Sequence, residues 1–297
     1  MADAKDSSKA AAIVAYQGSD GAYSQLAVEQ YFGETGKPVE CRGYPSFEAA
    51  LRAVECGAAH YAMQPIENTT AGSINEAYDL LAHMNLYVVG EEVLRIQHCL
   101  VGLAGAQTSE LRRIYSHPQA LLQCSRFLGS LTDCSVQSFA DTATSVKRVR
   151  DEHDRTQAAI ASERAAQLHG LQILQRDIAN QRDNFTRFVL VARTAAHYDE
   201  HTTCKTSLIF TTRDEQGALV RCLNILAEHG LNLTKIESRP RPETPWEYLF
   251  YVDVDGNIAS ANVAAALSAM QRHTIFFKVL GSYPARVRRP SAPPSTS

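Results

Sequence analysis

NFTRFVLV, at residues 184–191, joins three polar side chains to a short apolar run. Apolar runs rich in valine and leucine are typical of buried strands, so we expect residues 189–191 inside a sheet. Polar groups at the entrance of such a strand are held at the rim of a core. The planar guanidinium of Arg187 suits a carboxylate, because it can give two parallel hydrogen bonds. A solvent-facing arginine after an asparagine turn explains the same residues, and the stretch alone leaves both interpretations open.

Strand-like and helix-like segments alternate on the N-terminal side of this stretch, from about residue 13 onward. A strand at 13–16 precedes a helix that begins near Tyr23. Ser46 is a good N-cap for a second helix, whose apolar residues recur every three or four positions. A short strand at 157–161 leads into a helix that ends near Gly170. This alternation predicts an α/β fold with a largely parallel sheet.

The pattern changes after a polar connector at residues 194–204. Strands are expected at 205–210, 233–238, 248–254 and 276–280, and helices at 218–229 and 260–271. The order β-α-β-β-α-β within about 80 residues is the ferredoxin-like layout. The tail after Pro284 is rich in arginine, proline and serine, which predicts a solvated, disordered segment containing Arg286, Arg288 and Arg289.

Bulk composition excludes several classes of protein. The chain has 297 residues, a net charge of −3, 45% hydrophobic and 21% charged residues. These values give no reason to expect nucleic acid or an anionic membrane as a partner. The N-terminus lacks a secretory or transit pattern, so a cytoplasmic protein is expected. Seven scattered cysteines without a C-x-x-C pair favour reduced thiols.

Three local patterns invite a site, and each has a structural alternative. The loop at 18–21 has no G-x-G-x-x-G, yet a helix N-terminus behind glycines can offer free N–H groups to an anion. Asn68 and Thr69 can contact a ligand, although capping of the next helix is favoured. Ser116 reads as the N-cap of a helix that begins at Pro118. A metal site at His197, His201 and Cys204 is not favoured, because no fourth ligand is evident.

Five segments, taken in order, resemble the prephenate dehydratase family. They are GSDGAYS at 18–24, PIENTTAGSI at 65–74, SHPQALLQC at 116–124, NFTRF at 184–188 and NLTKIESRP at 232–240. The resemblance covers about residues 13–284, and its second part is similar to an ACT regulatory domain. It implies a catalytic domain at 12–193 and an ACT domain at 205–284, with tails at 1–11 and 285–297. The catalytic domain is expected to form two lobes of the periplasmic-binding-protein type, at about 12–94 with 176–193 and at about 95–175.

The resemblance also implies roles for residues in the matching segments. Thr186 is expected to donate a hydrogen bond to the departing hydroxyl of prephenate. The other implied catalytic residues are Asn68, Ser116 and Gln123. Substrate binding is implied for Arg187, Gly18, Gly21, Ala22, Tyr23, Ser24, Thr69 and Thr70. Asn68 and Thr186 are expected on one wall of the cleft, with Ser116 and Gln123 on the facing wall.

The implied activity is the decarboxylating dehydration of prephenate to phenylpyruvate, without metal or other cofactor. Phenylalanine is expected as an inhibitor, bound by residues of the ACT domain. These are Gly217, Ala218, Leu219, Asn232, Leu233, Glu237 and Ser238. A homodimer or homotetramer paired through ACT domains is implied. Two alternatives remain, an arogenate dehydratase that forms phenylalanine directly and a non-catalytic amino-acid sensor.

Overall fold

The computed structural model describes residues 11–241, 244 and 247–286. The N-terminal tail up to residue 10 and the C-terminal tail from residue 287, with Arg288 and Arg289, lie outside the described residues. The chain divides into two compact units, one of residues 1–77 with 94–191 and one of residues 78–93 with 192–297. The domain and lobe boundaries expected from the sequence stay predictions.

The first sheet is built from β-α-β units. Its strands run in the order β2-β1-β3-β11-β5, and β4 pairs with β3. They are β1 (Ala12–Gln17), β2 (Val39–Tyr44), β3 (Tyr61–Asn68), β4 (Gly72–Ser73), β5 (Tyr87–Arg95) and β11 (Phe185–Ala192). β1 is parallel to both β2 and β3. Residues 189–191 lie inside the sheet, as predicted, and their strand begins earlier, at Phe185, so most of NFTRF belongs to the strand itself.

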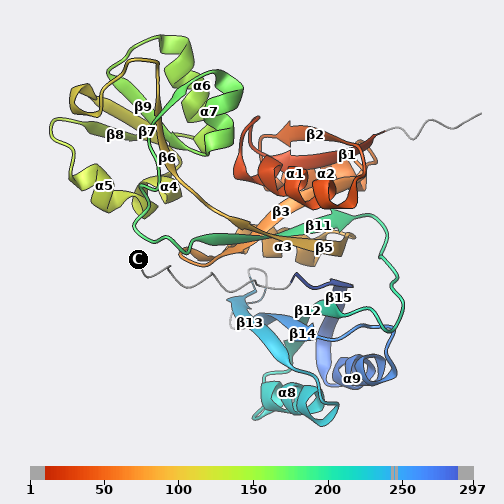
Figure 1. Cartoon of the computed structure of the whole chain (residues 1–297). Coiled ribbons are helices and arrows are strands. Elements are labelled where there is room, and N and C mark those ends of the chain that lie inside the picture. The colour runs from red at the N-terminus through yellow and green to blue at the C-terminus, as the bar shows by residue number, and fades with distance from the viewer. Residues whose placement is uncertain (1–10, 242–243, 245–246, 287–297) are drawn as a thin grey trace, which may run out of the picture. The chain divides into compact units, whose positions relative to one another are not determined.

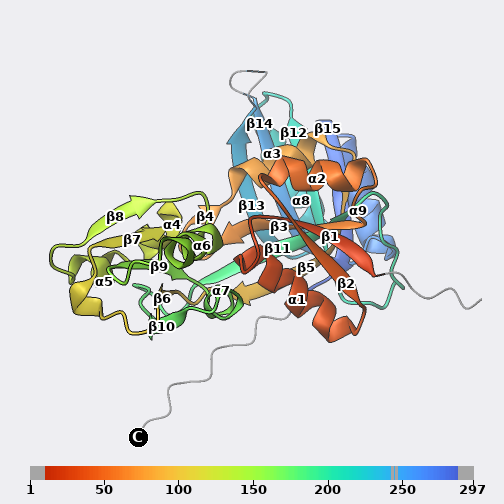
Figure 2. The ribbon, with the colours of Figure 1, turned by 90° about the horizontal axis from the view of Figure 1, so that it is seen from above.

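Helices α1 (Tyr23–Thr35) and α2 (Phe47–Glu55) cover opposite sides of β1–β3, as Figure 2 shows. The chain steps in one direction from β1 to β2 and in the other from β2 to β3. Right-handed crossovers in opposite directions place their helices on opposite faces. The Ser46 hydroxyl accepts the Ala49 N–H at 3.1 Å, which confirms the predicted N-cap of α2.

The second sheet has the order β10-β6-β9-β7-β8. Its strands are β6 (Cys99–Gly102), β7 (Arg113–Ser116), β8 (Ser135–Ser138), β9 (Gln157–Ala161) and β10 (Gln172–Gln175). β7 is parallel to β8 and β9, whereas β6 is antiparallel to β9 and β10. The parallel pairing expected from the alternation is therefore found in this sheet for β9, β7 and β8. We call the first sheet with α1 and α2 lobe 1, and the second sheet with its helices lobe 2.

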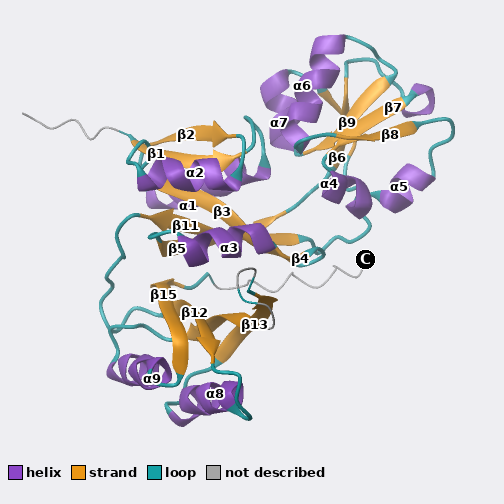
Figure 3. Cartoon of the chain, turned by 180° about the vertical axis from the view of Figure 1, so that it is seen from behind, coloured by secondary structure: helices purple, strands orange, loops and turns teal. Residues whose placement is uncertain are grey.

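The helices of lobe 2 lie on both faces of its sheet (Figure 3). They are α4 (Pro118–Gln123), α5 (Ser125–Gly129), α6 (Thr142–Glu152) and α7 (Glu163–His169), with a 3₁₀ turn, η1 (Thr108–Glu110), before β7. Residues of α6 and α7 share one apolar core cluster, and residues of α4 and α5 belong to another. Gly170 closes α7 in the left-handed conformation, as the sequence predicts.

The C-terminal part is a ferredoxin-like domain, which confirms its predicted layout. Its strand order is β13-β14-β12-β15, with each neighbouring pair antiparallel. The elements are β12 (Cys204–Thr212), α8 (Ala218–Glu228), β13 (Leu233–Pro240), β14 (Tyr248–Asp255), α9 (Ala261–Gln271) and β15 (Thr274–Pro284). Figure 1 shows α8 and α9 on the same side of this sheet. Their apolar residues form one core with Leu208, Phe210 and Val252.

Helix α3 (Asn75–His83) is attached to this sheet by two charged side chains. The Arg239 guanidinium on β13 donates to both oxygens of Asp79, at 2.9 and 2.6 Å. The Lys278 ammonium on β15 donates to three carbonyls at the end of α3, of which the Leu81 oxygen lies at 2.7 Å and the Met84 oxygen at 2.5 Å. Orphan carbonyls at a helix C-terminus favour a cation.

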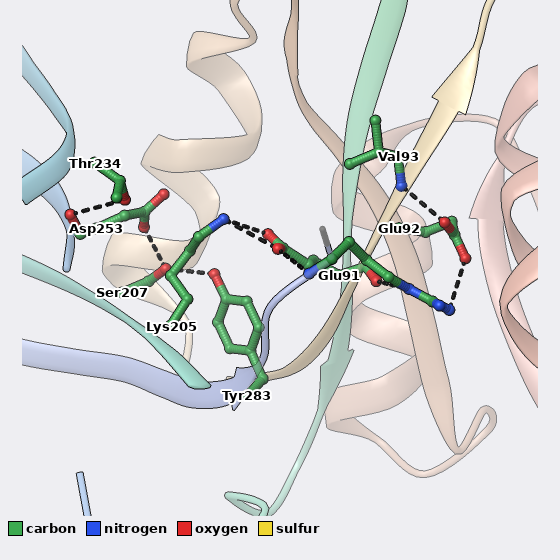
Figure 4. Close-up of polar contacts among 9 residues, drawn as sticks. Glu91, Glu92, Val93, Lys205, Ser207, Thr234, Asp253 and Tyr283 are labelled. Atoms are coloured by element: carbon green, nitrogen blue, oxygen red, sulfur yellow. Dashed lines mark hydrogen bonds and ion pairs between the residues drawn. The ribbon is translucent and has the colours of Figure 1, made fainter. Parts of the chain in front are cut away.

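Two adjacent buried carboxylates on β5 form a second set of ion pairs, shown in Figure 4. Glu91 is 1% exposed and accepts from the Lys205 ammonium at 2.9 and 3.0 Å. Glu92 is 3% exposed and accepts from the Arg286 guanidinium at 3.0 Å. The Arg286 backbone N–H also donates to Glu91, at 2.8 Å. The expectation that Arg286 belongs to a solvated tail is wrong, because two buried acids hold it.

Candidate active site

Five polar side chains from both lobes form one hydrogen-bonded group, which we call the polar cluster. They are Asn68, Thr70, Gln123, Asn184 and Thr186. The Asn68 amide nitrogen donates to Asn184 Oδ1 at 2.7 Å and to the Thr186 hydroxyl at 2.9 Å. The Gln123 amide nitrogen donates to the Thr70 hydroxyl at 2.7 Å and to Asn68 Oδ1 at 3.3 Å. The structure thus brings Asn68, Thr186 and Gln123 together from three distant segments.

The carboxamide of Asn68 also closes the loop that follows β3. Its oxygen accepts the backbone N–H groups of Thr70 and Ala71, both at 2.9 Å. A bond of this kind, from an asparagine side chain to the backbone two residues on, makes an Asx turn. Helix α3 begins only at Asn75, so the expectation that Asn68 and Thr69 cap it is wrong. The turn instead fixes the direction of the Asn68 amide.

The Thr186 hydroxyl has a defined polarity. Its side chain is 8% exposed, and its oxygen accepts an N–H from Asn68. An amide N–H can only donate, so the hydroxyl hydrogen of Thr186 is left to donate to another acceptor. This is the polarity that the predicted contact with a departing hydroxyl requires.

Gln123 is carried by α4, whose start is fixed by a histidine. The His117 ring accepts the Gln119 N–H at 3.2 Å, and Pro118 occupies the first helical position. Burial lowers the pKa of His117, which favours the neutral ring that can accept this bond. His117 is therefore the N-cap, and the expectation that Ser116 caps this helix is wrong.

The end of α4 is held by Asn180, in the loop before β11. Its amide donates to the Leu122 carbonyl at 3.2 Å and to the Ser125 hydroxyl at 2.9 Å. Its side-chain oxygen accepts the Arg126 N–H at 3.0 Å, and its backbone N–H donates to the Gln123 carbonyl at 2.7 Å. These four bonds fix the helix end from which the Gln123 side chain extends.

A cavity of about 230 Å³ opens beside the polar cluster. It is lined by Thr70, Gln119, Leu122, Gln123, Ser125, Ala179, Asn180, Gln181 and Asn184. Carboxamides and hydroxyls predominate, and none of these side chains is charged. Asn68 is bonded to three of the lining residues, and Thr186 is bonded to Asn68. The volume is below the usual range of about 300–1,000 Å³ for drug-sized ligands, so the cavity suits a small polar molecule.

One donor in this wall is unpaired. Asn184 is 1% exposed, and its side-chain nitrogen has no hydrogen-bond partner within the described residues. A buried donor without a partner costs roughly 1–3 kcal/mol, so it calls for an explanation such as a bound acceptor. Sequence reasoning left Asn184 out of the candidate site residues, although it belongs to NFTRF and a turn was only one of its two interpretations.

The polar cluster supplies hydrogen bonds rather than an acid. All of its five side chains are amides or hydroxyls, which stay neutral at physiological pH. A general acid needs a pKa near the working pH. Donors that are already oriented can instead stabilise an oxygen that becomes negative as a bond breaks. The cluster is therefore suited to polarising a leaving oxygen.

Two residues with predicted roles are not among the five side chains of the polar cluster. Ser116 is fully buried, and its hydroxyl donates to the Ile160 carbonyl at 2.6 Å. Ser116 is not among the residues that line the cavity, and its place on a wall with Gln123 stays a prediction. Arg187 is 7% exposed and follows Thr186 on β11. Successive side chains on a strand face opposite sides, so Arg187 points away from the Thr186 face. Its binding of a substrate carboxylate stays a prediction.

The loop between β1 and α1 packs against lobe 2. Its Gly18, Gly21 and Ala22 N–H groups donate to protein acceptors at 2.9, 2.6 and 3.0 Å, so these three groups are not free for an anion. The Ser162 hydroxyl donates to the Gly21 carbonyl at 2.9 Å. A Cβ at Gly21 would lie 2.7 Å from the Ala165 backbone, which explains the glycine. Substrate binding by this loop stays a prediction.

The other predicted substrate-binding residues are placed as follows. Thr69 joins its loop to β11, because its N–H donates to the Phe185 carbonyl and its hydroxyl accepts the Phe185 N–H, both at 2.9 Å. Ser24 is buried on α1. Tyr23 reaches the ring of His98, a buried residue that sequence reasoning missed because it lies outside the recognised segments.

The residues predicted to bind phenylalanine lie at the start of α8, in the loop before β13 and along β13. They are Gly217, Ala218, Leu219, Asn232, Leu233, Glu237 and Ser238. Gly217 is the N-cap of α8 and has a φ of 76°, which favours glycine. The Asn232 amide donates to the Asp255 carboxylate at 2.8 Å. Ser238 lies on the exposed face of β13, which is an edge strand.

Metal, thiol and membrane features are limited in the described part of the chain. No group of three or more His, Cys, Asp or Glu side chains is placed there to hold a metal ion. All seven cysteines are free thiols, and burial raises the pKa of Cys124 to about 12. None of the helices described has both the length and the apolar character needed to cross a bilayer.

Comparison with known proteins accounts for both parts of the chain. A family model described as prephenate dehydratase matches residues 14–196. The chain belongs to the prephenate dehydratase family. A second model, described as ACT domain, matches residues 206–270. These matches confirm the resemblance seen in the five sequence segments, and they identify the chain as a dehydratase, that is, a carbon–oxygen lyase.

Two curated relatives show the range of the family. The bifunctional chorismate mutase/prephenate dehydratase of Escherichia coli K12 is 40% identical over 274 residues, which cover 92% of this chain and 71% of that protein. The chloroplastic arogenate dehydratase/prephenate dehydratase 2 of Arabidopsis thaliana is 40% identical over 280 residues, covering 91% of this chain and 72% of that protein.

Solved structures share the fold across nearly the whole chain. The prephenate dehydratase of Arthrobacter aurescens, in complex with L-Phe, is 30% identical with a TM-score of 0.85, covering 94% of this chain and 92% of that chain. GqqA, described as a novel type of quorum quenching acylase, is 33% identical with a TM-score of 0.83, covering 92% and 98%. Because the fold also occurs in a protein described by another activity, the substrate has to be argued from the site.

Proposed function

We propose that the chain removes carbon dioxide and water from prephenate and releases phenylpyruvate. The observation that carries this proposal is the polar cluster, in which Asn68 leaves the Thr186 hydroxyl free to donate, beside a cavity lined by amides. The prephenate dehydratases of E. coli and A. aurescens support the choice of substrate. A cytoplasmic location stays a prediction from composition.

The reaction needs little from the protein beyond oriented donors. The bond between the ring and its carboxylate breaks, and the electron pair moves into the ring. The ring C–O bond breaks at the opposite carbon, and the oxygen leaves as water after taking up a proton. Aromatisation drives the change. Thr186 donates a hydrogen bond to the departing oxygen, where loss of one such donor typically costs about 10²–10³ in rate.

The cavity wall supplies neutral donors for the rest of the substrate. The unpaired side-chain nitrogen of Asn184 would gain an acceptor from a bound carboxylate or hydroxyl. The amides of Gln119 and Gln181 line the same space. A wall of this kind orients oxygen atoms without neutralising them, so we assign positive charge for the carboxylates to residues outside this cavity.

The test is a direct assay with two substrates. Purified full-length chain is incubated with prephenate or with arogenate, and phenylpyruvate and phenylalanine are measured against a blank without protein. Higher kcat/KM on prephenate supports the proposal. Higher kcat/KM on arogenate favours the alternative activity, which the A. thaliana relative supports. Turnover of neither substrate would refute both.

We propose that phenylalanine binds the ACT domain and inhibits the reaction. The L-Phe complex of the A. aurescens enzyme supports this, and the predicted ligands are the residues named above at α8 and β13. Coupling energies of about 1–3 kcal/mol are usual for such effects. The initial rate, measured over a phenylalanine titration, should fall to a plateau. A rate that stays constant would contradict the proposal.

We also propose a homodimer that forms through the ACT domains. Exposed apolar side chains support it, since Val220, Ile236 and Tyr248 are 56%, 42% and 41% exposed. Ile236 lies on β13, which is at the edge of the described sheet, and an edge strand can pair with a strand of a second chain. Sedimentation of the full chain should give at least twice the monomer mass, and Ile236→Asp should shift it toward the monomer. A monomeric parent chain would contradict the proposal.

A further inference from the structure

A series of partly buried hydrogen bonds joins the start of α1 to the polar cluster. The Tyr23 hydroxyl lies 3.0 Å from His98 Nδ1, and His98 Nε2 lies 2.8 Å from Gln123 Oε1. The Gln123 amide nitrogen then donates to Thr70 and Asn68. His98 is 2% exposed and is not among the cavity-lining residues, so it has no direct route to a substrate held there.

The direction of each bond follows from Gln123. Its nitrogen faces two oxygens of lobe 1, so its own oxygen faces His98 and must accept. His98 Nε2 therefore carries the hydrogen. A neutral imidazole has a single N–H, so Nδ1 accepts from the Tyr23 hydroxyl. Burial lowers the pKa of His98, which favours this neutral form.

The Tyr23–His98 pair is itself held in place. The Tyr23 hydroxyl also donates to the Gln97 carbonyl at 2.7 Å, so its hydrogen is shared between that oxygen and the ring nitrogen. The two rings meet edge to face, with their centres 5.6 Å apart. A ring held by packing and by both nitrogens cannot turn without losing these contacts, so the position of Nε2 is fixed.

The orientation of the Gln123 amide is set by the His98 N–H on one side and by Asn68 Oδ1 on the other. If the amide turned over, its oxygen would face Asn68 Oδ1, which already accepts backbone N–H groups and cannot turn with it. Two acceptor oxygens would then be opposed. His98 therefore supports, from the side opposite Asn68, the orientation in which Gln123 joins the two lobes and completes the cavity wall.

We infer that His98, supported by Tyr23, is a positioning residue for the dehydration, because its Nε2–H fixes the Gln123 amide against Asn68 and Thr70. The inference rests on the proposed function. His98 gives no proton to the substrate. It acts through Gln123, which keeps the Asn68 amide directed at the Thr186 hydroxyl.

The experiment compares kcat and KM of full-length variants on whichever substrate the parent chain converts. His98→Leu removes both hydrogen bonds, His98→Gln can place an N–H near the former Nε2, and Tyr23→Phe removes one hydroxyl. His169→Leu is the matched control, a half-buried histidine elsewhere in lobe 2. Circular dichroism and thermal unfolding verify that each variant is folded.

We expect His98→Leu to lower kcat by about 10- to 100-fold, the scale of a small misplacement near the chemistry. KM should change much less. His98→Gln should recover most of kcat, and His169→Leu should match the parent. In a double-mutant cycle, adding His98→Leu to Gln123→Ala should cost little more, because both act through one amide.

Two results would overturn the inference: an unchanged kcat in folded His98→Leu, or losses that multiply fully in the double variant. If His98→Leu does not fold, the test uses Tyr23→Phe, which keeps the aromatic ring and removes only the hydroxyl. A kcat of Tyr23→Phe equal to that of the parent would then contradict the inference. A parent chain that converts neither substrate would instead refute the proposed function, because there would be no kcat with which to compare the variants.

Discussion

Thr186 differs from valine by one hydroxyl group at nearly constant shape, so its replacement isolates the hydrogen bond from the packing. Thr186→Val should lower kcat by about 10²–10³, because the donor to the leaving oxygen is lost. Thr186→Ser keeps the hydroxyl and should retain much of the rate. Steady-state kinetics of the two folded variants give the comparison, and equal activity in both would exclude the assigned role.

At the residue scale, short motifs predicted side chains of the polar cluster but not His98, which contacts that cluster through Gln123. Asn68, Gln123 and Thr186 were found because each belongs to a recognisable segment. Ser116 belongs to one too, yet its hydroxyl bonds a backbone carbonyl, and a motif does not show which way a side chain points. His98 has no local signal, since its partners lie 25 and 75 residues away.

Helix α3 offers a prediction at the scale of one element. Lys278 donates to carbonyls at its C-terminus, where a cation is favourable. Lys278→Met keeps the apolar stem and removes the ammonium, so it should lower the free energy of unfolding by about 1–2 kcal/mol. Urea unfolding measures this. Lys147→Met, on the exposed side of α6, is the control, and an equal loss there would contradict the prediction.

Elements with caps and clear periodicity were predicted well. Ser46 and Pro118 marked the starts of α2 and α4, and the four strands of the ferredoxin-like domain were all found. The capping role expected of Asn68 failed because the same carboxamide can close a turn. Arg286 was assigned to a solvated tail by composition, which does not reveal that two acids far back in the chain are buried beside it.

For the whole molecule, the linker at 194–204 suggested where the domains divide. One boundary between the two compact units falls close to this linker, between residues 191 and 192, but residues 78–93 also group with the C-terminal part. Asp79, Glu91 and Glu92 explain this in physical terms, since their cations come from residues 239, 205 and 286. Ion pairs between residues so far apart in the sequence produce no local sequence pattern from which they could be predicted.

Stability at alkaline pH is a property of the whole chain. Burial raises the pKa of Tyr251, and the nearby Asp79 adds to the effect. A raised pKa means that the folded state keeps its proton where the unfolded state has lost it. The stabilisation is therefore complete below about pH 10 and is lost as the pH rises further. The pKa values of six cysteines are raised in the same direction.

The thermal midpoint of the chain should therefore fall as the pH rises above about 10. Tyr251→Phe removes one of the groups responsible, so its midpoint should fall less steeply over the same range. Scanning calorimetry at a series of pH values compares the two proteins. Parallel curves would contradict the contribution assigned to Tyr251.

The acids on β5 have a practical consequence for dissecting the protein. A fragment that stops at residue 193 keeps Glu91 and Glu92 but lacks both of their bases. A fragment of residues 205–284 keeps Lys205 without its acid. Buried charges stripped of their counter-charges strongly destabilise a protein. Catalysis and effector binding are therefore better separated by point substitutions at one site at a time in the full-length chain than by truncation.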